Sequence, residues 1–247
     1  MKQHIIHIPH SSTHIPFYDG YVCVRESLEN EIMLLTDWYT GDLFHSGGDM
    51  MVVADFSRIF CDVERFADDA EEPMAAFGMG ALYTHLDNSK PMRMVSTRLR
   101  ERIMTEYYHK HHQKLTNAVA TQLENAGHAL ILDCHSFPDQ PFRRDLDQSC
   151  HRPDICIGTD KFHSPKELVA CSTNYFIRLG YSVSVNSPYS GSIVPMRYYR
   201  KNKRVSSIMI EINRKLYLKD HGNEKSDTYD TIKRVVQGYF DLLSQLH

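Results

Sequence analysis

The chain has 247 residues, of which 42% are hydrophobic and 24% are charged, and its formal net charge is −3. The length allows one domain with a sizeable core, and the small charge excludes a general attraction to nucleic acid or anionic membranes. No apolar run approaches the roughly 18 residues of a membrane span, and the N-terminus lacks a signal-peptide pattern. We therefore expect a single cytoplasmic domain over residues 1–247, with neither nucleic-acid nor membrane partners.

Six cysteines are spread along the chain, and none forms a C-x-x-C pair. An even number of cysteines allows disulfides, but a chain of this length does not need them to fold. We therefore expect reduced thiols, as in a cytoplasmic protein. Fifteen histidines are many for this length, and they raise the chance of a metal site without locating it.

The first half of the chain predicts two short strands, an interrupted helix and a long loop. Isoleucines predict a strand over residues 4–8, and residues 50–54 are a second, buried candidate. Residues 26–46 have apolar side chains near helical spacing, with a break near Asp37. Residues 66–92 form an irregular loop, which we place near the functional site because long loops are uncommon unless they are functional.

The second half alternates helices with apolar strands. Its clearest helix covers residues 95–126 and is stopped by Gly127. Residues 128–134 are almost uninterruptedly apolar, which is typical of a central strand covered on both faces. This alternation predicts an α/β fold whose mixed or largely parallel sheet is flanked by helices. The remaining predicted strands are residues 154–158, 181–185 and 206–212, and the remaining predicted helices are residues 165–179 and 226–246.

Two histidines follow predicted strands, at the sheet edge where open α/β folds build their sites. His135 lies two residues after Asp133, so both side chains share one face of the strand, and Asp133 could orient a neighbouring group. This placement favours a functional His135 over a strand-end cap. His10 follows the first strand, and we favour metal ligation over a polar turn for it. His7 and His14 are nearby competitors.

Two carboxylates lie in apolar surroundings and therefore need partners. Asp37 interrupts an apolar helical segment, where a metal, an arginine or a helix cap would each serve it. Glu211 lies alone in an apolar strand, and desolvation would raise its pKa toward that of a general base. The alternative for Glu211 is a structural ion pair with Arg214 or another arginine. Two imidazoles and one carboxylate would make a catalytic zinc set that leaves one position for water.

Four arginines lie close to the predicted strand ends. Arginine suits bidentate recognition of carboxylates, although exposure to solvent is the usual state of a single arginine. The basic stretch over residues 98–102, followed by histidines at 109, 111 and 112, has helical spacing, which favours a solvated helix face over a nucleic-acid patch. One of these histidines could still face the pocket. The four arginines are Arg58, Arg65, Arg197 and Arg214.

Six segments, in order along the chain, resemble the N-formylglutamate amidohydrolase (deformylase) family. Each segment alone is weak, but six in the same order are fairly specific. The segments are Ile8-Pro9-His10-Ser11-Ser12, Leu35-Thr36-Asp37, Asp62-Val63-Glu64-Arg65, Asp133-Cys134-His135-Ser136-Phe137-Pro138, Asn186-Ser187-Pro188-Tyr189-Ser190-Gly191 and Glu211-Ile212-Asn213-Arg214-Lys215-Leu216-Tyr217.

The resemblance implies a fold similar to those of zinc carboxypeptidases and zinc-dependent muramoyl-alanine amidases, of the phosphorylase/hydrolase type. It also implies a metal at the sheet edge, with His10, Asp37 and His135 as its ligands. Glu211 then occupies the general-base position. The expected cofactor is Zn²⁺, although the same side chains hold Co, Mn or Fe.

The implied reaction is hydrolysis of the formyl amide of N-formyl-L-glutamate to formate and L-glutamate, a reaction of histidine degradation. Arg65, Asn213 and Arg214 fall where the family has substrate-facing polar groups. One or more of Arg65, Arg197 and Arg214 would hold the two carboxylates of the substrate. Tyr189, in a loop rich in Gly, Pro and Ser, could close over the bound molecule.

One position departs from the family pattern. The family commonly has Asp-x-Asn-Arg where this chain has Glu64 before Arg65, which adds a negative charge beside a site for an anionic substrate. One alternative is therefore a zinc amidase or carboxypeptidase-like hydrolase of another N-acyl amino acid or a peptide. A second is a non-catalytic protein that binds small acids, against which the set of His10, Asp37, His135 and Glu211 argues.

Overall fold

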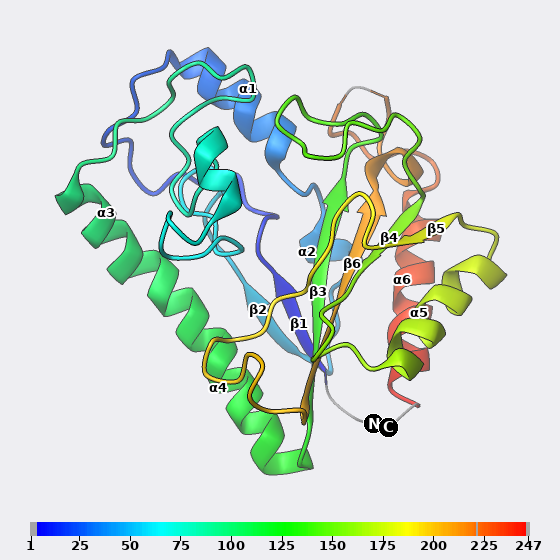
Figure 1. The fold of residues 1–247 in the computed structure, drawn as a ribbon. Coiled ribbons are helices and arrows are strands. Elements are labelled where there is room, and N and C mark those ends of the chain that lie inside the picture. Colours follow the sequence, from blue (N-terminus) through cyan, green and yellow to red (C-terminus); the bar gives the residue numbers. More distant parts are fainter. Residues whose placement is uncertain (1–3, 221, 246–247) are drawn as a thin grey trace.

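A computed structural model describes residues 4–220 and 222–245, and it contains one six-stranded sheet with helices on both faces (Figure 1). The predicted mixed, largely parallel α/β sheet is confirmed. The strands lie in the spatial order β2-β1-β3-β6-β4-β5. Their bounds are β1 Ile5–Ile8, β2 Met50–Val53, β3 Ala129–Phe137, β4 Ile155–Gly158, β5 Val183–Val185 and β6 Val205–Asn213.

Four neighbouring strands run parallel, so their carboxyl ends meet at one edge of the sheet. β1 pairs in parallel with β2 and β3, and β3 pairs in parallel with β6. β4 is antiparallel to β6 and parallel to β5. In the central pair, His135 of β3 lies opposite Glu211 of β6. The sheet register alone therefore brings these two side chains together.

The helices cover the two faces of the sheet unequally. α4 packs along one face, against β1, β2 and β3, whereas α5 and α6 lie on the other face (Figure 1). Of the helices described, none is long and apolar enough to cross a membrane. The α-helices are α1 Arg25–Leu35, α2 Thr40–Leu43, α3 Thr97–Ile103, α4 His109–Ala126, α5 Lys166–Arg178 and α6 Tyr229–Leu243.

The element boundaries follow local signals in the sequence. The predicted break near Asp37 separates α1 from α2, and Gly127 ends α4 with a left-handed φ of 77°. The predicted helix over residues 95–126 is continued between α3 and α4 by a π turn at Met104–Tyr108. The loop predicted over residues 66–92 contains a short 3-10 helix at Pro73–Phe77.

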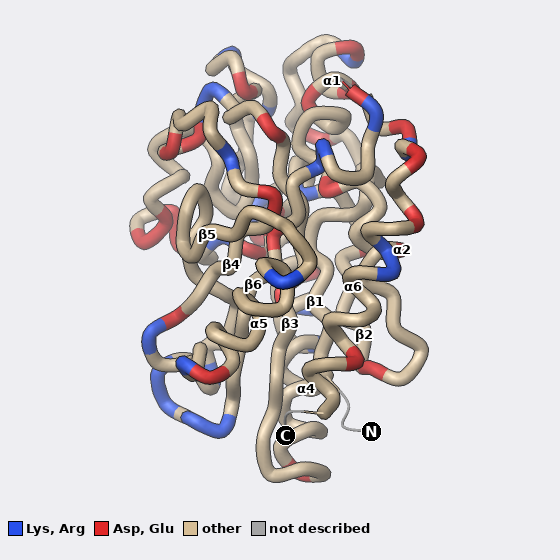
Figure 2. Tube along the Cα trace, turned by 90° about the vertical axis from the view of Figure 1, so that its right-hand side faces the viewer, with Lys and Arg blue, Asp and Glu red and all other residues tan. Residues whose placement is uncertain are grey.

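Successive side chains of the strands point alternately to the two faces of the sheet and so pack in two different clusters. Ile6 and Ile8 of β1 pack in the cluster that includes α5 and α6, whereas Ile5 packs with α4. Most strand residues are apolar, and both signs of charge lie on the loops around the carboxyl ends of the strands (Figure 2). All six cysteines are free, in line with the expected reduced thiols.

Candidate metal centre and active site

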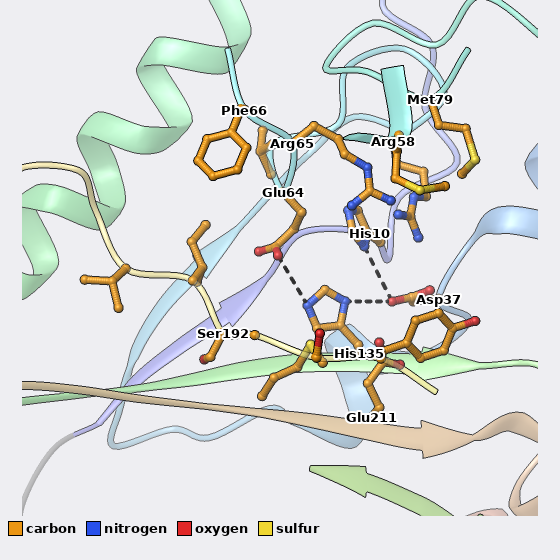
Figure 3. A pocket seen from close by; sticks show the side chains of 18 of the residues that line it. His10, Asp37, Arg58, Glu64, Arg65, Phe66, Met79, His135, Ser192 and Glu211 are labelled. Carbon is orange, nitrogen blue, oxygen red and sulfur yellow. Dashed lines mark hydrogen bonds and ion pairs between the residues drawn. The ribbon is translucent and has the colours of Figure 1, made fainter. Parts of the chain in front are cut away.

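A cavity of about 870 Å³ opens at the carboxyl ends of the parallel strands. His10, Asp37, His135 and Glu211, the four residues singled out for chemistry, all line it (Figure 3). Their convergence follows from topology, because parallel strands end at the same edge of a sheet. Around them the cavity is walled by residues 63–68, by part of α4 and by residues 188–197.

His10 lies just beyond β1, with its ring 98% buried. Its Nε2 is 2.8 Å from Oδ1 of Asp62. A carboxylate only accepts, so Nε2–H donates and Nδ1 keeps its lone pair. No described residue forms a hydrogen bond with His10 Nδ1, and the nearest carboxylate oxygen, Asp37 Oδ2, is 3.7 Å away.

His135 near the end of β3 has the corresponding arrangement. Its Nε2–H donates to Oδ1 of Asp133 at 3.0 Å, and its Nδ1 lies 3.2 Å from Oδ2 of Asp37. Asp133 is fully buried and also accepts from the backbone N–H of Ile193 at 3.0 Å. The group that Asp133 is placed to orient is therefore the ring of His135 itself. Such histidine–carboxylate pairs fix the tautomer of a metal ligand.

Asp37 is held in place from three directions. Its backbone N–H donates to the carbonyl of His10, which ties the end of α1 to the end of β1. Oδ1 accepts from Arg214 Nη2 at 3.0 Å, and Oδ2 accepts from the N–H of Ser136 at 3.2 Å. Burial alone would raise the pKa of Asp37, but the adjacent side chains of His10, His135 and Arg214 hold it below the usual range.

These three side chains fit a divalent metal. One ligand atom each from His10, Asp37 and His135 lies within 4.8 Å of the others, and all three residues are buried. Two imidazole nitrogens and one carboxylate oxygen are a ligand set of catalytic zinc sites. The buried lone pair of His10 Nδ1, which has no hydrogen bond to any described residue, is what such a site requires.

Glu211 projects from β6 next to His135. It is 93% buried, and its Oε2 has no hydrogen-bond partner among the described residues. Burial raises the pKa of the Glu211 carboxyl to about 8, although the charges of His135, Arg58 and Arg214 act in the opposite direction. A bound cation would lower this pKa again. With a cation bound, Glu211 Oε2, which has no hydrogen bond to a described residue, could accept a proton at the site.

Two arginines form a cationic wall around Asp62. Arg58 Nη2 donates to Asp62 Oδ2 at 3.0 Å, and Arg65 Nε lies 3.9 Å from the same oxygen. Tyr83 also donates to this oxygen, at 2.7 Å. One carboxylate therefore faces two guanidinium groups, and both arginines line the cavity. This wall retains a net positive charge for an anionic ligand.

The other predicted substrate residues occupy different positions. Arg214 lines the cavity, but it donates to Asp37, to the carbonyls of Leu34 and Ser136 and to Ser136 Oγ. Arg197 lines the cavity and lies over the Tyr198 ring.

Asn213 is fully buried, and its amide donates to Asp139 and to the carbonyl of Pro153. It does not line the cavity, within the part of the chain that the structure describes. Tyr189 lines the cavity, and its hydroxyl lies between Arg152 and Asp145.

Several residues at the site were not assigned a role from the sequence. Asp62 was named only as the first residue of the segment Asp62-Val63-Glu64-Arg65, yet it accepts a hydrogen bond from His10. His7, ranked below His10, packs within 2.8 Å of His111 of α4. In the sequence, only its position inside β1, three residues before His10, pointed to a role for His7. Its contact with His111 could not be foreseen, because the two residues are 104 positions apart.

Comparison with known proteins gives one consistent result. A family model described as N-formylglutamate amidohydrolase matches residues 3–218. An N-formylglutamate deformylase of Pseudomonas putida is 25% identical over 214 residues, which cover 80% of this chain and 76% of that protein.

Solved structures match the fold over almost the whole chain. The crystal structure of an N-formylglutamate amidohydrolase from Ralstonia eutropha JMP134 superposes with a TM-score of 0.84, at 24% identity, over 98% of this chain and 92% of the other. A gene product from Agrobacterium tumefaciens gives a TM-score of 0.67 at 15% identity, over 99% and 92% of the two chains.

Proposed function

Since the chain belongs to the N-formylglutamate amidohydrolase family and is a hydrolase of amide bonds, we propose that it cleaves N-formyl-L-glutamate to formate and L-glutamate with a divalent metal. The family resemblance inferred from six sequence segments is thereby confirmed. The observation that carries the proposal is the buried set of His10, Asp37 and His135 beside Glu211. The names of the relatives supply the choice of substrate.

The metal would be held by Nδ1 of both histidines and by Asp37. Asp62 and Asp133 accept from the opposite ring nitrogens, so both lone pairs are turned toward the carboxylate of Asp37. Arg214 restrains that carboxylate from behind. When bound, Zn²⁺ or a similar ion would polarise the formyl carbonyl as a Lewis acid.

Glu211 would act as general base and then as general acid. Its free Oε2 accepts a proton from the attacking water, and the resulting acid returns that proton to the leaving nitrogen as the amide C–N bond breaks. The products are formate and an amine. Burial among apolar strand residues excludes bulk solvent from this carboxyl and favours its holding a proton between the two transfers.

The carboxylates of the substrate would be held by arginines on the cavity wall. Arg65 and Arg197 suit this role best, because four hydrogen bonds already engage Arg214. Arg58 shares the wall with Arg65. Tyr189 would contact the substrate from the loop that faces the arginines, and Asn213 would support the adjacent β6 end rather than touch the substrate.

The size of the cavity favours a second candidate, hydrolysis of a longer N-acyl amino acid or a peptide. N-formylglutamate has about a dozen non-hydrogen atoms, whereas pockets of about 300–1,000 Å³ hold drug-sized ligands. The cavity of about 870 Å³ lies in the upper part of that range. Its rim carries the exposed apolar side chains of Phe66, Leu146 and Met196, which a small dianion does not need.

Metal analysis and a formate assay test the proposal together. We expect metal in the purified protein and formate release from N-formyl-L-glutamate that a chelator stops and added Zn²⁺ restores. Metal without formate release, but with turnover of longer N-acyl amino acids, would select the second candidate. Any turnover eliminates a purely acid-binding protein. Neither metal nor turnover after zinc is added back would contradict the ligand assignment.

A further inference from the structure

A second group of metal-competent side chains lies beside the first. His7 of β1, Glu64 and Asp133 of β3 each offer one ligand atom, and these atoms lie within 4.8 Å of one another. The three residues come from segments 57 and 69 residues apart in the sequence, so the fold has assembled them rather than a local turn.

The three side chains converge at hydrogen-bond range. His7 Nδ1 lies 2.9 Å from Asp133 Oδ1 and 3.2 Å from Glu64 Oε1. The side chains of His7 and Asp133 are fully buried, and that of Glu64 is 15% exposed. Glu64 Oε1 is itself inaccessible to solvent and lies in ion-pair contact with His7 Nδ1. An imidazole and two carboxylates thus meet around one point away from bulk water.

A neighbouring histidine restricts how His7 carries its hydrogens. Nε2 of His7 is 2.8 Å from Nε2 of His111, so one hydrogen lies between the two rings. When His111 accepts, His7 Nε2–H donates, and the Nδ1 lone pair of a neutral His7 faces the two carboxylates. Three sets of lone pairs would then converge on one point, where a cation would neutralise the two carboxylates.

We propose that His7, Glu64 and Asp133 form a second site for a divalent first-row cation, such as Zn²⁺ or Mn²⁺. One nitrogen and two carboxylate oxygens suit these ions. Bonds of about 2.0–2.2 Å place adjacent ligand atoms about 3–3.6 Å apart. The two contacts of His7 Nδ1, at 2.9 and 3.2 Å, lie close to that spacing. Glu64 lines the cavity, which gives the ion a path of entry.

The second site touches the first through one carboxylate. Asp133 Oδ1 faces both His7 Nδ1 and His135 Nε2, at 2.9 and 3.0 Å. Asp37 and Glu64 lie on opposite sides of the His135 ring (Figure 3). The two ions would therefore be separated by an imidazole, unlike the co-catalytic pairs about 3.5–4 Å apart that clamp one substrate. The role of the second ion is to hold Asp133, and through it His135.

A proton is the competitor for this site. Burial lowers the pKa of His7, but hydrogen bonds with Asp133 and Glu64 outweigh it and raise the pKa to about 9. An imidazolium could therefore supply the positive charge instead of a metal. The two occupants differ in metal stoichiometry, which can be measured without any substrate.

The test is a metal titration of the chelator-stripped protein, followed by gel filtration and elemental analysis. We expect two Zn²⁺ ions per chain in the wild type and one in Glu64→Gln, which removes a charged ligand but keeps the side-chain size. His10→Ala should also bind one ion. Glu71→Gln, which changes another carboxylate of the cavity wall, is the matched control and should bind two.

One ion per chain in both the wild type and Glu64→Gln would overturn the proposal and leave a protonated His7 in the cluster. Two ions retained in Glu64→Gln would overturn it as well, because the second ion would then lie elsewhere. Circular dichroism of each variant checks folding. Failure of formate release would leave these stoichiometries unchanged, so the second site and the proposed function fail independently.

Discussion

The two faces of the central strands β3 and β6 differ sharply in polarity, although alternate residues of the same strands form both faces. On the face toward α5 and α6, β3 and β6 present Leu132, Cys134 and Ile210 to an apolar core. On the face toward α4, the intervening positions are Asp133, His135 and Glu211. Because strand side chains alternate with a period of two, one strand can anchor the fold and carry chemistry at once. Stability and activity should therefore respond separately to substitutions on the two faces.

Glu211→Gln should give the largest effect and should be confined to the chemistry. Losing a general acid–base group should lower kcat by about 100- to 10,000-fold. Metal content and the unfolding midpoint should stay close to wild type, because the amide keeps the size of the side chain. Steady-state formate release and elemental analysis measure both quantities. If the metal were lost, Glu211 would be a ligand and not the base.

Phe240→Ala tests the opposite face. Phe240 of α6 is 4% exposed and packs against Phe44. Its truncation should lower the free energy of unfolding by about 3–5 kcal/mol. Urea unfolding gives this value, while metal stoichiometry at low temperature should remain unchanged. Exposed Ile177 on α5 is the control, and Ile177→Ala should change stability little. Loss of metal from folded Phe240→Ala would show that the two faces are coupled.

Asp62→Asn tests the support behind the ligands. Asp62 accepts from His10 Nε2 and faces Arg58, so the amide weakens the hold on the ring and leaves a buried guanidinium less well paired. Substituting such a partner typically costs about 10- to 100-fold in metal affinity. Competition with a chelator measures the change. Asp69→Asn removes an exposed carboxylate that pairs with Arg100 and should bind metal as the wild type does. Equal affinities would contradict the orienting role.

The strands, and three of the four residues that converge at the cavity, could be picked out from the sequence because their signals are local. His10, His135 and Glu211 stand out at the ends of, or within, apolar runs. Asp37 could not be assigned from its surroundings, because its partner Arg214 lies 177 residues away. Likewise Asp62 meets His10 across 52 residues. Spacing along the chain holds no information on such pairs. They form only when α1 and the loop after β2 pack against the ends of the strands.

The smallest expected effect is a loss of stability in acid, and it arises where Asp42 of α2 contacts α6. Hydrogen bonds from Lys233 and Tyr229 lower the pKa of the Asp42 carboxyl from its usual value near 3.8 to about 2. The folded state therefore binds this proton less readily, so the stabilisation is present above pH 4 and is lost as the pH falls toward 2. Because the carboxylate is 44% exposed, screening limits the effect to about 1 kcal/mol or less. Asp42→Asn should lower stability at pH 7 and match the wild type near pH 2, whereas exposed Asp55→Asn should follow the wild-type profile throughout. A constant difference between Asp42→Asn and wild type from pH 7 to pH 2 would mean that the loss comes from packing and not from charge.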